Sequence, residues 1–193
     1  MPTRPPGRPR NEEADTAILA AALALFVEGG AGAVSIEQVA RRAGVTRATV
    51  YRRFADTTQL LIAAVEASYG NPSRTPEIRD LDELLSGWAH VLADPDRRRL
   101  LRRLYAATDD IPELAQSYRS SYGDTRDDAR RAVLENARDH GQLPPDTDVD
   151  VLLDVLTGAV WQHLATRPDS TSAAETERYL RAVLHQAGHR PSS

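Results

Sequence analysis

Apolar residues recur at helical spacing from one end of this chain to the other, and that periodicity is what most constrains its fold. From Ile18 to Phe26, and again from Val149 to Leu164, the apolar residues follow one another in steps of three and four. Such steps place side chains on one face of an α-helix. No segment shows the alternation of apolar and polar residues that is typical of a half-buried strand. The sequence therefore predicts an all-α protein.

Capping residues and turn formers divide this pattern into separate helices. The first helix is expected to begin at an Asn11 cap and to stop at Gly29-Gly30. Ser35, Thr46 and Asp56 have the residue types of N-caps and predict three more helices, ending near Ala43, Phe54 and Tyr69. Turn formers fill residues 70–76. Later helices are expected near residues 81–92, 96–107 and 111–134 (extending toward 139), from Asp146 or Asp148 to about 164, and across 176–187.

The charge is distributed unevenly along the chain. The 193 residues carry a formal net charge of −4, which taken alone argues against a nucleic-acid binder. Residues 1–55, however, hold eight arginines against five acidic residues, whereas the remainder carries −7. All the basic residues are arginine. A basic N-terminal quarter followed by an acidic body fits a small DNA-binding module on a larger domain.

Residues 35–51 have the pattern of a helix-turn-helix. Ala40 is small where two helices cross closely, and Gly44 suits a left-handed turn between them. Val39, Val45 and Val50 are spaced to fill the wedge between the helices. A plain helical hairpin with a glycine turn is the alternative. The combination of small residue, glycine, caps and flanking arginines favours the helix-turn-helix.

The predicted DNA-binding residues follow from this arrangement. The N-terminal turn of the second helix meets base edges in the major groove, where arginine bonds guanine and threonine offers a hydroxyl or methyl group. Arginine and tyrosine after that turn suit phosphates. Residues 1–10 form a predicted flexible basic arm that enters the minor groove or, alternatively, attracts DNA only nonspecifically. The full predicted set is Arg8, Arg10, Ser35, Thr46, Arg47, Ala48, Thr49, Tyr51, Arg52, Arg53 and Thr58.

Residues 11–70 resemble the DNA-binding domain of the TetR (tetracycline repressor) family of transcriptional regulators. The resemblance is carried by Phe26, Gly29-Gly30, residues 35–40, Ala43-Gly44-Val45-Thr46, residues 50–54 and Leu60-Leu61. Members of the family usually have a phosphate-contacting lysine at the start of the fourth helix, and Thr58 occupies that place here. The resemblance implies a homodimer on a palindromic double-stranded operator, with recognition helices roughly 34–36 Å apart.

The same resemblance implies that residues 77–190 form a helical domain that binds a small organic effector and dimerises. Residues 137–144, followed by an acidic helix start, look like a common C-terminal subtype. The apolar faces of the last two helices are candidates for a dimer-forming bundle, although they could equally serve an intramolecular core. Residues 97–99 with Arg102 and Arg103 are expected to form a solvated face paired to nearby acids.

Aromatic residues in the second domain are the candidates for an effector pocket. Apolar walls with a few polar tips suit a small organic ligand. Ordinary core packing is the alternative for each residue. The predicted ligand-binding set is Trp88, Tyr105, Tyr118, Tyr122, Trp161 and His163.

Catalysis has no visible basis in the sequence. There is no cysteine, no Gly-x-Ser-x-Gly elbow and no phosphate-binding glycine loop, and His185 and His189 have no acidic third ligand. We therefore expect neither an enzyme nor a cofactor or metal. The longest apolar stretch, 17–27, is too short to span a bilayer, and no export signal is present, so a cytoplasmic protein is expected.

These observations predict a ligand-responsive DNA-binding regulator, a homodimeric repressor released from its operator by an effector. The alternative is a helical protein–protein interaction module that docks on a partner through its C-terminal bundle and does not bind DNA sequence-specifically.

Overall fold

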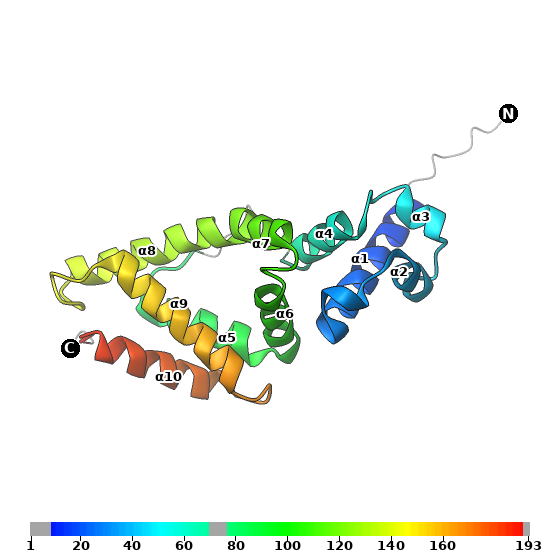
Figure 1. The fold of residues 1–193 in the computed structure, drawn as a ribbon. Coiled ribbons are helices and arrows are strands. Elements are labelled where there is room, and N and C mark those ends of the chain that lie inside the picture. The colour runs from blue at the N-terminus through cyan, green and yellow to red at the C-terminus, as the bar shows by residue number, and fades with distance from the viewer. Residues whose placement is uncertain (1–8, 70–76, 191–193) are drawn as a thin grey trace. The chain divides into compact units, whose positions relative to one another are not determined.

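A computed structural model of the chain describes residues 9–69 and 77–190, and in these ranges every regular element is helical (Figure 1). The all-α prediction is thus confirmed. The α-helices are α1 (Pro9–Gly29), α2 (Ile36–Ala43), α3 (Arg47–Tyr51), α4 (Thr57–Tyr69), α5 (Leu81–Ala93), α6 (Pro95–Ala106), α7 (Pro112–Tyr118), α8 (Asp124–Asp139), α9 (Val149–Thr166) and α10 (Ala173–Gln186).

The predicted helix starts follow from local capping chemistry, and the three caps of the N-terminal region are confirmed. The Ser35 side chain accepts the Gln38 amide, and the Thr46 side chain accepts that of Thr49. Asp56 accepts the Gln59 amide at 2.8 Å. Each bond satisfies one of the amides that a helix N-terminus leaves without an intrahelical partner. Of the two residues proposed for the start of the penultimate helix, Asp148 is the cap.

Several helix boundaries differ from the predictions. Helix α3 ends at Tyr51 and not near Phe54, and the last helix begins at Ala173. The first helix begins at Pro9, so Asn11 lies inside it and is not its cap. Proline is well suited to a first helical turn, because its fixed φ is already helical and its missing amide has no partner to lose there. The helix predicted across 111–134 is interrupted by a π turn at Arg119–Gly123. Two serines and a glycine in that turn weaken the regular helical hydrogen bonding.

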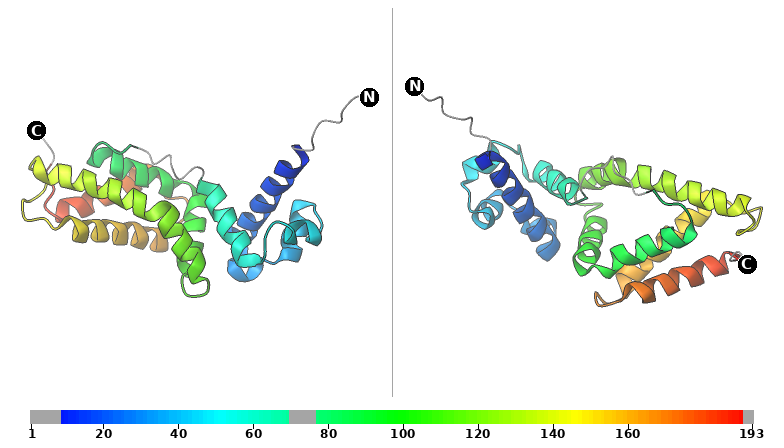
Figure 2. Two further views of the ribbon diagram at one scale, coloured as in Figure 1. Left: turned by 90° about the horizontal axis from the view of Figure 1, so that it is seen from above. Right: turned by 180° about the vertical axis from the view of Figure 1, so that it is seen from behind.

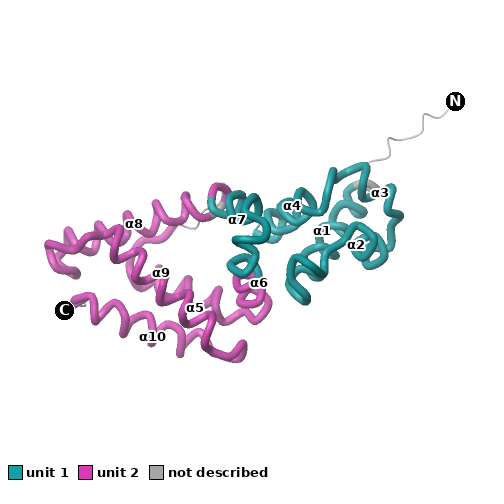
Figure 3. The backbone as a smooth tube through the Cα atoms, in the orientation of Figure 1, with its two compact units in different colours: residues 1–72, 103–119 teal, residues 73–102, 120–193 magenta. Residues whose placement is uncertain are grey.

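The chain divides into two compact units, coloured separately in Figure 3. The first unit comprises residues 1–72 and 103–119. In it α1 packs against α2 and α4, and α4 packs against α7. Its core is formed by fully or almost fully buried apolar side chains, among them Ile18, Phe26, Val39, Leu60, Leu61 and Leu114. The sequence predicted two continuous domains, 11–70 and 77–190. Residues 103–119 were expected in the second and belong to the first unit.

The second unit comprises residues 73–102 and 120–193. Each of its four long helices packs against two others, in the cyclic order α5, α10, α9, α8 (Figure 2). The buried residues at the centre come from all four helices and include Leu85, Leu134, Leu156 and Leu180. Apolar faces on the last two helices therefore contribute to an intramolecular core, which was one of the two alternatives left open for them.

Candidate nucleic-acid interface

The turn between α2 and α3 is fixed by Gly44. Its backbone is left-handed, with φ 68° and ψ 28°, and its amide lies over the last turn of α2. The amide of Val45 donates to the carbonyl of Ala40 at 3.0 Å, which closes the helix end. Ala40 is buried, as expected for the residue where the two helices approach. The helix-turn-helix geometry predicted from these residues is confirmed.

Helix α3 buries one side chain and exposes its N-terminal turn. Val50 is completely buried, whereas Thr46, Arg47 and Ala48 are exposed and Thr49 is half-buried. The hydroxyls of Thr46 and Thr49 lie 2.9 Å apart, so the two threonines hold each other in the first turn. The turn is thus held by hydrogen bonds between its own residues and open to solvent, as suits a helix that enters the major groove.

The arginines around α3 are in different environments. Arg52 is exposed, and Arg47 lies 3.7 Å from Glu37 in a pair whose side chains are both mostly in solvent. An exposed pair at that distance contributes little, so Arg47 can exchange Glu37 for a base or phosphate. Tyr51 is 60% exposed, an unusual exposure for a large aromatic side chain. These three exposed residues are among the DNA contacts predicted from the sequence.

Arg53 is placed differently from the expected phosphate contact. Its guanidinium Nε is paired with Asp15 of α1, and Nη1 donates to the carbonyl of Thr49 at 3.0 Å. A second arginine pairs with α1 in the same unit: Arg42 of α2 donates two hydrogen bonds of 2.6 Å to Glu28 of α1. That contact lowers the pKa of Glu28 below its ordinary value and raises the pKa of Arg42.

Arg41 is a further candidate DNA contact that was not predicted from the sequence. Arg41 is exposed and stands one helical turn after Glu37, so it shares the face of α2 that lies beside Arg47. Its position is the signal that could have found it, because residues four apart on a helix are neighbours. Ser35 is half-buried at the start of α2, where its side chain is the cap.

The remaining predicted contacts are only partly visible. Arg8 lies outside the described residues, and Arg10 lies in α1 although its side chain is not described. The fourth helix begins at Thr57, so Thr58 is its second residue, and both are half-buried. Neither residue carries the charge of the family's lysine.

The six predicted ligand-binding residues do not all belong to one unit. Trp88, Trp161 and His163 lie in the second unit, where Trp88 and His163 are buried. Tyr105 is 47% exposed and lies in the first unit with Tyr118, which packs against Tyr69 at 5.3 Å between ring centroids. The side chain of Tyr122 is not among those that the structure describes.

Trp88 borders a cavity between α5 and α8. The cavity has a volume of about 200 Å³. The guanidinium of Arg130 lies 5.0 Å from the centre of the Trp88 ring, a cation–π distance. The lining combines apolar side chains with two arginines and two glutamates: Glu77, Ile78, Glu83, Leu84, Gly87, Trp88, Val91, Arg126 and Arg130.

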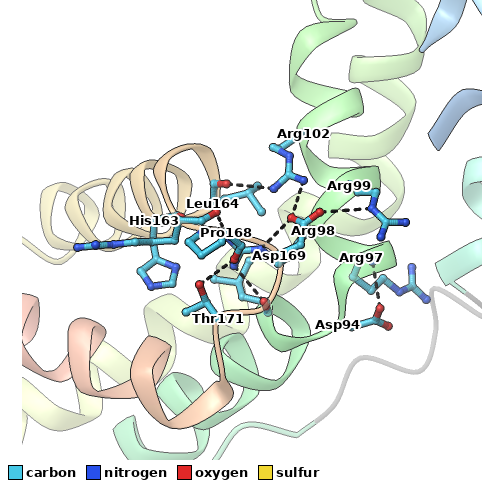
Figure 4. A network of polar contacts seen from close by, with 12 residues as sticks. Asp94, Arg97, Arg98, Arg99, Arg102, His163, Leu164, Pro168, Asp169 and Thr171 are labelled. Atoms are coloured by element: carbon cyan, nitrogen blue, oxygen red, sulfur yellow. Dashed lines mark hydrogen bonds and ion pairs between the residues drawn. The ribbon is translucent and has the colours of Figure 1, made fainter. Parts of the chain in front are cut away.

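Arg98 contradicts the predicted solvated arginine face, because its side chain is completely buried. Its Nη1 donates to the carbonyl of Leu92 at 3.0 Å, and its Nη2 donates to the carbonyls of Arg167 at 2.9 Å and His163 at 3.4 Å. Figure 4 shows Arg98 between His163 and the other labelled arginines of α6, beside Asp169. The Nε atom lies 3.5 Å from Asp169 Oδ1. Burial lowers the pKa of Arg98, although the carbonyls and carboxylate compensate the charge.

Asp169 also receives two neighbouring arginines of α6. Arg102 Nη2 lies 2.7 Å from Oδ1 and Arg99 Nε lies 3.3 Å from Oδ2. The bond from Arg102 lowers the pKa of Asp169. The predicted pairing with nearby acids thus holds for Arg99 and Arg102, while Arg98 ties α6 to the segment that follows α9.

Comparison with known proteins identifies the family. Residues 18–64 match the family described as bacterial regulatory proteins, tetR family, and residues 78–183 match the one described as tetracyclin repressor-like, C-terminal domain. The second match alone covers more than half of the chain. The chain belongs to the TetR family.

Relatives of this TetR-family chain extend along most of its length. It is 25% identical over 185 residues to the uncharacterised HTH-type transcriptional regulator YdeS of Bacillus subtilis, covering 94% of this chain and 91% of YdeS. It is 28% identical over 147 residues to the HTH-type transcriptional regulator AqdR of Rhodococcus erythropolis, covering 74% and 70%. Its fold is similar to that of MexZ, a Pseudomonas aeruginosa repressor, with a TM-score of 0.70, 24% identity and coverage of 94% and 96%.

Family membership and geometry agree on what the N-terminal unit does. As a TetR-family transcriptional regulator, the chain binds DNA through its helix-turn-helix, and the family is not an enzyme family.

Among the described residues, no helix is long and apolar enough to cross a membrane. In the same residues no group of three or more His, Asp or Glu side chains is placed to hold a metal ion.

Proposed function

We propose that this TetR-family regulator is a homodimeric repressor that binds a palindromic operator and leaves it when a small organic effector binds. The observation that carries the DNA-reading part is the environment of α3. A single buried residue, Val50, anchors the helix, while the turn from Thr46 to Ala48 is rigid and exposed. Such a turn can enter the major groove without rearranging the rest of the unit.

Base and phosphate contacts are divided along α3. Arg47 bonds guanine, and Thr49 and Ala48 meet bases at closer range, as their positions in the first turn allow. Arg52 and Arg41 flank that turn and neutralise phosphates, while the hydroxyl of Tyr51 donates a hydrogen bond to a phosphate oxygen. Each arginine on a phosphate steepens the dependence of the logarithm of affinity on the logarithm of salt by about 0.9.

The effector is proposed to occupy the cavity beside Trp88. Its volume of about 200 Å³ is smaller than a drug-sized site, which needs roughly 300–1,000 Å³. The effector is therefore a small molecule with an apolar, preferably planar, part against Trp88 and polar atoms toward Arg126 and Arg130. A coupling of about 1–3 kcal/mol between the two sites weakens operator binding roughly 5- to 150-fold.

Dimerisation is proposed to use the outer face of α9. Val151 and Val155 are one turn apart and are 56% and 49% exposed, so both present apolar surface to solvent. Gly158 continues the face, and a Cβ there would meet open space. The second copy covers this stripe, in line with the bundle that the family resemblance implies. Replacing Val151 and Val155 with aspartate is expected to give a monomer with an unchanged helical content.

The experiment that tests the proposal is selection of duplex DNA from a random library by the full-length protein. The expected product is a palindrome protected in two half-sites about 10 base pairs apart or a multiple of that. Light scattering measures the stoichiometry, and a library of small aromatic compounds screened for release of the selected duplex identifies the effector. If the protein binds DNA but no sequence is enriched, the proposed recognition of a palindromic operator is wrong.

A further inference from the structure

Arg53 connects the recognition helix to the long helix behind it. The residue follows the end of α3 and its side chain is only 12% exposed, much less than that of Arg52 on its N-terminal side. One edge of the guanidinium is paired with Asp15 of α1, and Nη1 donates to the backbone carbonyl of Thr49. The planar fork of arginine donates to two such acceptors in a fixed relative geometry, whereas the donors of a lysine ammonium lie on one atom and rotate freely.

The hydrogen bond from Arg53 to the carbonyl of Thr49 supports a short helix. Helix α3 has only five residues, so it has too few turns to fix its own axis, and the carbonyls of its last turn have no partner within the helix. Val50 anchors it on one side. The hydrogen bond from Arg53 adds a second fixed point, on the backbone of the same residue whose side chain lies in the DNA-reading turn.

We propose that Arg53 is a positioning residue that acts together with Asp15: the pair sets the orientation of α3, and Arg53 is not a phosphate contact. This inference rests on the proposed role of α3 as the recognition helix. It adds Asp15, an acidic residue on α1, to the residues that operator recognition requires. It also leaves the phosphate contacts of this segment to Arg52 and Tyr51, whose side chains are exposed.

The two possible roles of Arg53 predict opposite effects when Asp15 is removed. If Arg53 binds phosphate, Asp15 competes with DNA for the guanidinium and adds a negative charge near it. The Asp15→Ala variant would then bind DNA as tightly as the wild type or more tightly. If the pair positions α3, the same variant loses part of the support of that helix and binds its operator more weakly, even though its net charge has become more favourable for DNA.

The test uses the full-length chain and two duplexes, the sequence selected from a random library by the wild type and a scrambled sequence of equal length. We expect Asp15→Ala and Arg53→Lys each to bind the selected duplex roughly tenfold more weakly, which corresponds to a typical coupling between contacting groups. Binding of Asp15→Ala to the scrambled duplex is expected to be unchanged or slightly tighter. The double variant is expected to be no weaker than the weaker single variant, because both changes break one interaction.

Glu13→Ala is the matched control, since it removes an exposed negative charge from the same helix and is expected to leave operator affinity the same or slightly higher. Thermal unfolding of every variant shows that binding is measured on folded protein, and Asp15→Asn replaces Asp15→Ala if the latter does not fold. The proposal is overturned if the Asp15 variant binds the selected duplex at least as tightly as the wild type, or if Arg53→Lys retains full affinity. Failure of the selection itself would contradict the proposed function instead.

Discussion

Replacing Arg98 with methionine tests whether this buried guanidinium holds the second unit together. Methionine retains much of the volume of the arginine stem but donates no hydrogen bond. The carbonyl of Leu92 lies in the last turn of α5 and the carbonyl of Arg167 follows the end of α9, so both lose their guanidinium donor. A buried carbonyl left without a donor costs about 1–3 kcal/mol.

The expected loss is smaller than the sum of these contacts. Removing Arg98 also relieves the burial of a charge, and Asp169 keeps Arg99 and Arg102 as partners. We therefore expect Arg98→Met to lower the free energy of unfolding of the second unit by about 2–4 kcal/mol. Arg99→Met is the matched control, because the Arg99 side chain is 47% exposed and contacts the same carboxylate. Its expected cost is under about 1 kcal/mol.

Urea unfolding followed by tryptophan fluorescence measures these values for the correct part of the chain. The chain has two tryptophans, Trp88 and Trp161, and both belong to the second unit. Their emission therefore reports on the unfolding of that unit. The reasoning is refuted if Arg98→Met unfolds within about 0.5 kcal/mol of the wild type, the usual range for surface substitutions, or if Arg99→Met costs as much.

Three further predictions concern single residues. Gly44→Ala is expected to destabilise the first unit by about 1–2 kcal/mol in thermal unfolding, because φ is +68° while the space around a Cβ is open, so the cost is backbone strain alone. Arg47→Ala is expected to lose about 1–3 kcal/mol of discrimination at one operator position in competition binding, and equal losses on all sequences would contradict a base contact. Burial, reinforced by Arg98 and Arg167, lowers the pKa of His163 below its ordinary 6.5. Below pH 6.5 the unfolded chain therefore binds a proton that the folded chain does not. The free energy of unfolding consequently falls as the pH is lowered. His163→Gln is expected to make that fall in melting temperature shallower. The remaining fall is due to His189, whose pKa burial also lowers, and at lower pH to Glu28 and Asp169, whose pKa values are lowered by contacts with arginine.

Features that depend on neighbouring residues were predictable from the sequence. Ser35, Thr46 and Asp56 cap helices because each side chain reaches an amide three residues away. Gly44 is identifiable for the same reason, since the conformation it adopts is a local property of the backbone. The predicted start of α1 was wrong because two local signals competed. The helical backbone of Pro9 started the helix before Asn11 could cap it.

Features that depend on distant partners were not predictable. Arg53 pairs with Asp15, 38 residues earlier, and Arg98 donates to the carbonyl of Arg167, 69 residues later. In the sequence both arginines belong to ordinary runs of charge, and nothing in those runs indicates which member is buried. The six predicted ligand-binding residues are divided for the same reason, because Tyr105 and Tyr118 follow the expected domain boundary but belong to the unit of the N-terminal helices, where Tyr118 packs against Tyr69.

The packing of α7 on α4 has a consequence for exchanging domains between relatives. Ser117 of α7 donates a hydrogen bond to Glu66 of α4 at 2.8 Å, and the neighbouring Leu114 is buried. A chimera joined near residue 72 would combine α4 from one parent with α7 from another. Because α4 and α7 pack against each other, a graft that carries residues 103–119 with the N-terminal segment is the one expected to fold and bind DNA.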